Sequence, residues 1–136
     1  MKTDRNRLAF TLIELMVVVI IIAALAAMVV PKVLPATTDA KRRISKGDIA
    51  NISMALKLYR LHNDKYPSTE DGLGILLKPS TSKDWKDSYL EKAAVDPWER
   101  KYQYVCPGSH SQAGFDLWSM GPDGQTGGGD DITNWD

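Results

Sequence analysis

The chain has 136 residues, 43% of them hydrophobic and 25% charged, and its 17 Lys and Arg balance 17 Asp and Glu. The length fits one domain of ordinary size, while the composition argues against disorder throughout and against a strongly basic nucleic-acid binder. One cysteine, Cys106, excludes an internal disulfide, and two histidines leave little material for a zinc site. The charge balance conceals two unequal halves. Residues 1–65 carry eleven basic and five acidic side chains, and residues 66–136 carry six and twelve.

Residues 10–30 form an almost uniformly apolar stretch in which Glu14 is the only charged side chain. As a helix rising about 1.5 Å per residue, the stretch would be about 31 Å long, close to the hydrocarbon thickness of a bilayer. The basic segment 1–9 before it predicts a cytoplasmic N-terminus. A cleaved signal peptide is the alternative, but its apolar region is usually about 7–15 residues long. We therefore expect a membrane-spanning helix over residues 10–30.

Glu14 conflicts with that environment, because a carboxylate in a membrane segment costs roughly 2–3 kcal/mol. It either snorkels to the lipid headgroups or pairs with a cation from another chain. The stretch Ala9-Phe10-Thr11-Leu12-Ile13-Glu14 resembles the cleavage motif of type IV pilins and pseudopilins, although that family usually has Gly where Ala9 stands. The resemblance implies that a prepilin peptidase removes residues 1–9 by cutting between Ala9 and Phe10. It also implies that the new amine of Phe10 is methylated and pairs with Glu14 of a neighbouring subunit.

The rest of the chain, residues 31–136, is expected to form a small α+β head that includes the second half of the long helix. Pro31 and Pro35 predict a kink or local melting, with helix resuming at Thr37 or Thr38 and running to about Asn63. One helical stripe within that range predicts a face packed against a sheet: Ile49, Ile52, Leu56 and Tyr59.

Short elements are expected after the long helix. Ser68 or Thr69 is predicted to cap a short helix that ends at Leu77. Residues 102–105 and 115–120 are predicted to be antiparallel strands, with a weaker third strand near residues 92–95. Asp116, on the second of these strands, is expected at the surface.

The C-terminal segment combines acidic side chains with five glycines between positions 121 and 129. Such a loop is entropically costly to order, and the carboxylates of Asp123, Asp130 and Asp131 would repel one another when brought together. A calcium ion would offset both effects, since it binds six to eight oxygen ligands with flexible geometry. A solvated acidic tail is the alternative, because the spacing is not that of an EF-hand.

Several motifs, in order, resemble the major pseudopilins of bacterial type II secretion systems: Tyr66-Pro67, Gly72-Leu73, Asp96-Pro97-Trp98, Tyr102-Gln103-Tyr104, Ser119-Met120-Gly121-Pro122-Asp123-Gly124, Asp130-Asp131-Ile132 and Asn134-Trp135. The resemblance implies a type IV pilin-like fold, a long N-terminal helix packed on a small antiparallel sheet. It also implies one calcium ion, held by the side chains of Asp123, Asp130 and Asp131 and by the backbone carbonyls of Met120, Gln125 and Gly128.

The same resemblance implies a structural role. The mature chain would leave the inner membrane as a homopolymer held together through residues 10–30, a periplasmic pseudopilus that helps drive folded exoproteins across the outer membrane. Its expected partners are minor pseudopilins, prepilin peptidase, the inner-membrane assembly platform and the outer-membrane secretin, without nucleic acid.

Three other functions are weighed against that role. The major pilin of a surface type IV pilus is the alternative, but such pilins commonly close a C-terminal disulfide, and Cys106 is alone. A single-pass anchored binding or signalling protein is a further class. Catalysis is not expected, because His62, His110 and Cys106 lie in no recognisable nucleophile context.

Overall fold

The structure, a computed structural model, describes residues 10–83 and 85–136, with side chains at all of these positions except 29–36. The predicted leader, residues 1–9, therefore lies outside the described residues. The chain divides into two compact units, Met1–Thr37 and Thr38–Asp136. The described elements are helix α1 (Leu12–Asn63), the 3₁₀ helix η1 (Leu73–Leu77), and strands β1 (Gln103–Val105), β2 (Asp116–Ser119) and β3 (Ile132–Thr133).

Helix α1 is continuous through both of its internal prolines. The predicted local melting near Pro31, with a new helix start at Thr37 or Thr38, is therefore wrong, whereas a kink within the helix stays a prediction. Pro31 and Pro35 have no N–H group, so the carbonyls of Ala27 and Pro31 each lose one hydrogen-bond donor. The other residues of the helix can still form their backbone hydrogen bonds. Helix α1 therefore extends over 52 residues without interruption.

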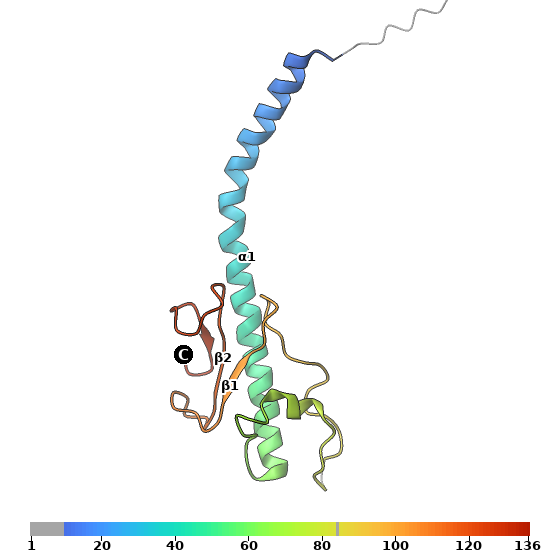
Figure 1. Cartoon of the computed structure of the whole chain (residues 1–136), viewed down its shortest axis with the longest axis vertical. Coiled ribbons are helices and arrows are strands. Elements are labelled where there is room, and N and C mark those ends of the chain that lie inside the picture. The colour runs from blue at the N-terminus through green and yellow to red at the C-terminus, as the bar shows by residue number, and fades with distance from the viewer. Residues whose placement is uncertain (1–9, 84) are drawn as a thin grey trace, which may run out of the picture. The chain divides into compact units, whose positions relative to one another are not determined.

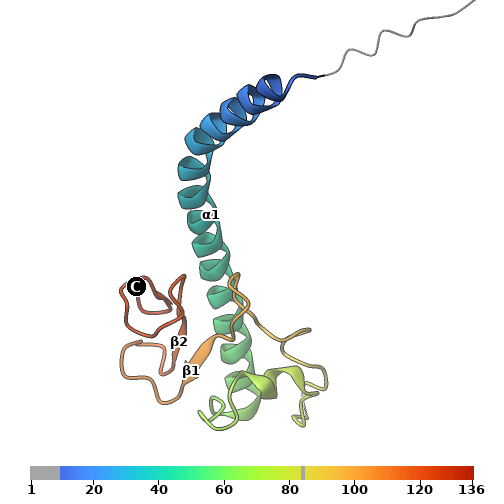
Figure 2. The ribbon, with the colours of Figure 1, turned by 45° about the horizontal axis from the view of Figure 1, so that its top comes forward.

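The second unit, Thr38–Asp136, packs the later turns of α1 against the sheet and η1, as Figures 1 and 2 show. The predicted stripe on α1 is confirmed, since Ile49, Ile52 and Leu56 are at most 4% exposed and Tyr59 packs against them. Ala55 on α1 is also buried, and the segments that face the helix contribute the remaining members of this core cluster: Leu76, Tyr102, Tyr104, Phe115, Leu117 and Ile132.

The sheet is antiparallel with the order β1-β2-β3. Gln103 lies opposite Trp118 in the first pair, and Ser119 lies opposite Ile132 in the second. The predicted third strand near residues 92–95 is wrong, because that region contributes only an isolated bridge between Val95 and Lys101. The third strand is the two-residue β3, which is too short to give a periodic sequence signal and forms only because β2 offers it a paired edge.

The predicted short helix is shorter than expected. Gly72 precedes η1, and no side chain caps the helix. Ser68 nevertheless makes reciprocal hydrogen bonds with Asp71, in which its hydroxyl and N–H donate to the carboxylate and the Asp71 N–H donates to its hydroxyl. The predicted cap therefore stabilises a turn over residues 68–72, and only the residues after that turn are helical.

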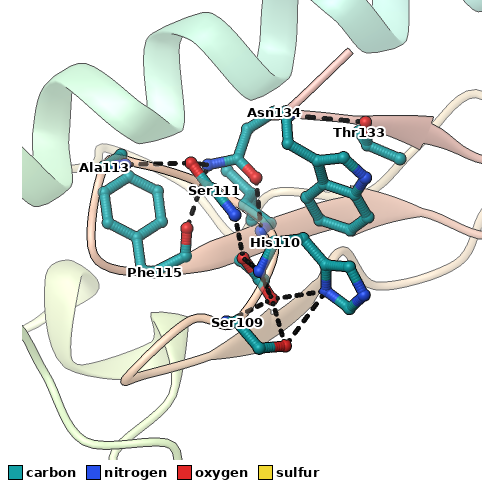
Figure 3. Close-up of polar contacts among 10 residues, drawn as sticks. Ser109, His110, Ser111, Ala113, Phe115, Thr133 and Asn134 are labelled. Carbon is teal, nitrogen blue, oxygen red and sulfur yellow. Dashed lines mark hydrogen bonds and ion pairs between the residues drawn. The ribbon is translucent and has the colours of Figure 1, made fainter.

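Asp116, expected at the surface, is 3% exposed. The loop after β1 wraps around its carboxylate, which accepts the backbone N–H groups of Ser109, His110 and Ser111 at 2.8–3.1 Å (Figure 3). The Nδ1 atom of His110 lies 2.8 Å from the Asp116 carboxylate. The predicted surface position was wrong because the alternation of a strand places a side chain on one face of the sheet but does not reveal that a loop covers that face.

These contacts set the charge state of Asp116. Burial raises the pKa of its carboxyl, but hydrogen bonds from the Ser111 backbone, the His110 side chain and the neighbouring N–H groups outweigh that effect and lower the pKa to about 2. Asp116 is therefore ionised throughout the physiological pH range.

Asn134 joins the C-terminus to the same region (Figure 3). Its backbone N–H donates to the Leu117 carbonyl, and its side-chain oxygen accepts the Leu117 N–H at 2.9 Å. Its side-chain NH₂ donates to the Phe115 carbonyl and the Ser111 hydroxyl. The pairing of β2 with β3 is thus continued by a side chain, which anchors the downstream end of the loop between these two strands.

The Asp116→Asn variant tests this carboxylate. An unfolded Asp, with its ordinary pKa of about 3.8, takes up a proton more readily than the folded group, so the stabilising effect is complete above about pH 4 and is lost as the pH falls toward 2. The variant should lower the free energy of unfolding by about 2 kcal/mol at neutral pH, and the difference from wild type should shrink between about pH 4 and 2. Urea denaturation of the full chain in detergent micelles measures this difference. Asp136→Asn is the matched exposed control, and a difference that does not change with pH would contradict the assignment.

Candidate functional site

The first unit presents an apolar helix surface. All described side chains from Phe10 to Met28 are exposed, and the large apolar ones among them have exposed fractions between 49% and 86%. Each square ångström of such surface left in water forgoes about 25 cal/mol of stabilisation. Within the described ranges, 10–83 and 85–136, no helix has the combined length and hydropathy of a membrane span.

Glu14 makes hydrogen bonds within its own chain that were not predicted from the sequence. The N–H and hydroxyl of Thr11 both donate to Glu14 Oε2, at 2.9 and 3.0 Å, and the Glu14 N–H donates back to Thr11 Oγ1 at 3.3 Å. This reciprocal pattern is a capping box, in which Thr11 precedes the first helical residue, Leu12. The signal was present in the sequence as Thr-x-x-Glu before an apolar run.

The remaining predicted processing residues are only partly described. Phe10 is 86% exposed, and Ala9 lies outside the described residues. The predicted cleavage between them, the methylation of Phe10 and its pairing with Glu14 of another copy all stay predictions.

The predicted metal ligands lie in the loop that joins β2 to β3. Because Ser119 pairs with Ile132, the residues that follow β2 are brought close to those that precede β3. The Asp123 N–H donates to Asp130 Oδ2 at 3.2 Å, and the Gly127 N–H donates to Asp131 Oδ2 at 2.8 Å. Strand pairing thus brings Asp123, near the start of the loop, close to Asp130, near its end.

Gly128 lies where two of these carboxylates converge. A Cβ atom at this position would clash with Asp123 Oδ2 and would lie 2.8 Å from Asp130 Oδ1. The absence of a side chain at position 128 therefore allows these oxygens to approach one another beside the backbone. Gly121 also matters, because its φ is +62° and a Cβ there would clash with the Asp130 carbonyl.

Two carboxylate oxygens in the loop lack partners. Asp130 Oδ1 and Asp131 Oδ1 are buried and accept no hydrogen bond from the described residues. Leaving a buried charged acceptor unsatisfied costs more than the roughly 1–3 kcal/mol of a neutral one. Hard oxygen donors of this kind fit calcium, so the residues present are compatible with the predicted ion.

The ligand set is only partly assembled, however. Within the part of the chain that the structure describes, no three His, Cys, Asp or Glu side chains form a ready metal cluster. The carbonyl ligands expected from Met120, Gln125 and Gly128 stay predictions.

A hydrogen-bond network around Asp96, beside the β2–β3 loop, was not predicted. Asp96 is 3% exposed, and its carboxylate accepts the N–H groups of Trp98 and Arg100 and the hydroxyl of Ser119. The sequence marked Asp96-Pro97-Trp98 only as a turn. An Asp before Pro often accepts hydrogen bonds from N–H groups that follow it, which was the available signal.

His62, His110 and Cys106, which showed no nucleophile context in the sequence, make contacts with aromatic rings, a hydroxyl or a carbonyl. His62 stacks on Trp85 with 5.5 Å between ring centroids, and its Nδ1 lies 3.3 Å from the Tyr89 hydroxyl. The Cys106 thiol lies 3.6 Å from the Gly114 carbonyl. The His110 ring stacks on Trp135, with 4.9 Å between centroids.

Comparison with known proteins identifies the family. Residues 32–135 match the family described as type II secretion system (T2SS), protein G, and residues 4–30 match the prokaryotic N-terminal methylation motif. The type II secretion system core protein G of Pseudomonas aeruginosa is 50% identical over 140 residues, covering 97% of each chain. The protein of the same name from Escherichia coli K12 is 41% identical, covering 98% of this chain and 93% of that protein.

A solved structure supports the same conclusion. The crystal structure of the major pseudopilin from the type 2 secretion system of enterohaemorrhagic Escherichia coli has 34% sequence identity and a TM-score of 0.65. The match covers 75% of this chain and 88% of that one. The predicted α+β pilin-like fold is thereby confirmed, and these matches favour the secretion pseudopilin over the surface pilin. The chain belongs to the type II secretion system protein G family, whose members are structural pseudopilins.

Proposed function

We propose that this chain is anchored in the inner membrane by its apolar helix and then polymerises through residues 10–30 into a periplasmic pseudopilus that helps move folded exoproteins across the outer membrane. The observation that carries the proposal is the exposure of every side chain from Phe10 to Met28, nearly all of them apolar. Lipid and neighbouring copies of the same helix are the two environments that cover all faces of such a segment. Prepilin peptidase, minor pseudopilins, an assembly platform and a secretin are the partners that this role requires.

Processing is proposed to occur between Ala9 and Phe10, followed by methylation of the new amine. Residues 4–30 match the methylation motif, which supports this step. Ala9 is small, as the usual Gly is.

Mass spectrometry tests the processing directly. The mature protein should lack residues 1–9 and should carry one added methyl group on Phe10. An Ala9→Gly variant is the matched control, because it restores the residue usual in the family. An intact Met1 terminus in the wild-type chain, together with normal processing of Ala9→Gly, would show that Ala9 blocks cleavage.

Glu14 is proposed to pair with the Phe10 amine of a neighbouring copy, in addition to capping its own helix. In a low-dielectric bundle, a charge is tolerated only when an opposite charge lies beside it, which would fix the axial register of neighbouring subunits. The capping box occupies Oε2 through Thr11. The two roles are therefore separable, because capping requires a hydrogen-bond acceptor and pairing requires a negative charge.

Two substitutions separate these roles. Glu14→Gln keeps a side chain that serves in a capping box, whereas Glu14→Ala removes both the cap and the charge. If inter-chain pairing is essential, both variants should insert into the membrane but form no filaments in electron micrographs of sheared fibres. Normal filaments from Glu14→Gln would contradict the pairing and leave capping as the main role of this residue.

We also propose that the β2–β3 loop binds one calcium ion through Asp123, Asp130 and Asp131, with carbonyl groups completing the set. When bound, the ion would supply a positive charge that screens the three carboxylates from one another. The buried, unpaired oxygens of Asp130 and Asp131 support the proposal. The convergence of Asp123 and Asp130 beside Gly128 supports it as well.

Calcium removal tests this site. A ligand present at 100 times its dissociation constant stabilises the folded state by about 2.7 kcal/mol, so chelation should lower the melting temperature of the full chain in detergent micelles by several degrees. Asp131→Asn should abolish the response. Asp136→Asn, an exposed acid five residues further on, should keep it. A wild-type melting temperature that is the same in calcium and in chelator would refute the site.

A further inference from the structure

Arg100 contacts the start of the β2–β3 loop through its side chain. Its Nη1–H donates to the Gly121 carbonyl at 2.6 Å, and its Nη2–H donates to the Pro122 carbonyl at 3.3 Å. These are the two carbonyls immediately before Asp123. A Cβ atom at Gly124 would lie 2.6 Å from the Arg100 Cζ, so the loop backbone packs directly against the guanidinium plane.

A closed ring of hydrogen bonds holds Arg100 in this place. The Asp96 carboxylate accepts the Arg100 backbone N–H through Oδ1 at 2.8 Å and the Ser119 hydroxyl through Oδ2 at 2.6 Å. The Ser119 hydroxyl oxygen in turn accepts the Gly121 N–H at 3.2 Å. Because the Gly121 carbonyl accepts the Arg100 side chain, the ring returns to its starting residue.

The ring of hydrogen bonds connects buried residues to the start of the glycine-rich β2–β3 loop. Asp96 and Ser119 are 3% and 0% exposed, and Ser119 is the last residue of β2. The loop beyond it is rich in glycine and would sample many conformations on its own. Fixing the carbonyls of Gly121 and Pro122 determines the direction in which the chain enters Asp123.

We infer that Arg100 is a positioning residue for the proposed calcium loop, holding Gly121 and Pro122 so that Asp123 is oriented toward the ion. The inference rests on the proposed calcium site. The Arg100 side chain has no oxygen atom, so it is not a calcium ligand. It acts by reducing the conformational freedom that the loop loses when the ion binds.

The two possible roles of Arg100 predict opposite changes in calcium affinity when its charge is removed. A guanidinium near a calcium ion repels it, so a purely electrostatic role predicts that neutralising Arg100 tightens binding. A positioning role predicts the opposite, a weakening of about 10- to 100-fold, as is typical when residues that orient metal ligands are removed. Salt screens the repulsion at this partly exposed site, whereas the hydrogen-bond geometry is not screened, so weakening is the expected net result.

The experiment is a calcium titration of the full chain in detergent micelles by isothermal calorimetry and tryptophan fluorescence. Trp118 is a built-in reporter, because its indole N–H donates to the Thr126 hydroxyl within the loop. Arg100→Gln removes the charge and the fork of donors. Lys101→Gln is the matched control, since it removes the same charge from the next residue, whose side chain is exposed. Arg100→Lys keeps the charge but replaces the rigid fork with one flexible ammonium group, and should give intermediate affinity.

We expect Arg100→Gln to bind calcium about 10- to 100-fold more weakly than wild type, while Lys101→Gln binds equally or slightly more tightly. Equal or tighter binding by Arg100→Gln, with a normal wild-type response, would overturn the inference and leave the calcium site standing. The absence of any saturable response in wild type would overturn both. If Arg100→Gln fails to fold in chelator, Arg100→Lys decides, and wild-type affinity in that variant overturns the inference.

Discussion

Between Leu12 and Met28, α1 presents apolar side chains in every direction, and no other described element of its own unit covers them. Burial of apolar surface contributes about 25 cal/mol per Å², so a helix of this length reaches low free energy only within lipid or among other helices. The capping box formed by Thr11 and Glu14 satisfies the exposed end of the helix locally. In this box, Glu14 Oε2 accepts hydrogen bonds from the Thr11 N–H and hydroxyl, which gives the carboxylate a role within its own chain.

The second unit depends on a different balance. Its core of α1, η1 and sheet residues is continuous, but the loop between β2 and β3 has little apolar surface to bury. Polar contacts therefore hold both ends of this loop, the Asp96–Ser119–Arg100 ring at one end and Asn134 at the other. The loop carries its carboxylates between two fixed points, which limits its conformational entropy.

Two corrected expectations show where local reasoning was insufficient. A third strand was expected near residues 92–95, but β2 pairs instead with the two residues of β3. Asp116 was expected at the surface, but the loop of residues 109–111 encloses it and supplies three N–H donors. In each case the deciding contribution came from neighbours that the residue's own sequence position does not reveal.

The sequence alone determined the apolar helix, the buried stripe from Ile49 to Tyr59 and the family, because periodicity and ordered motifs depend on residue identity within short windows. It also marked Asp123, Asp130 and Asp131 as candidate ligands. Only the tertiary structure decided which strand closes the sheet, which carboxylates are buried and how Arg100 reaches the loop. Those features depend on contacts between different segments of the chain, and the geometry of such contacts is set by packing rather than by any local pattern.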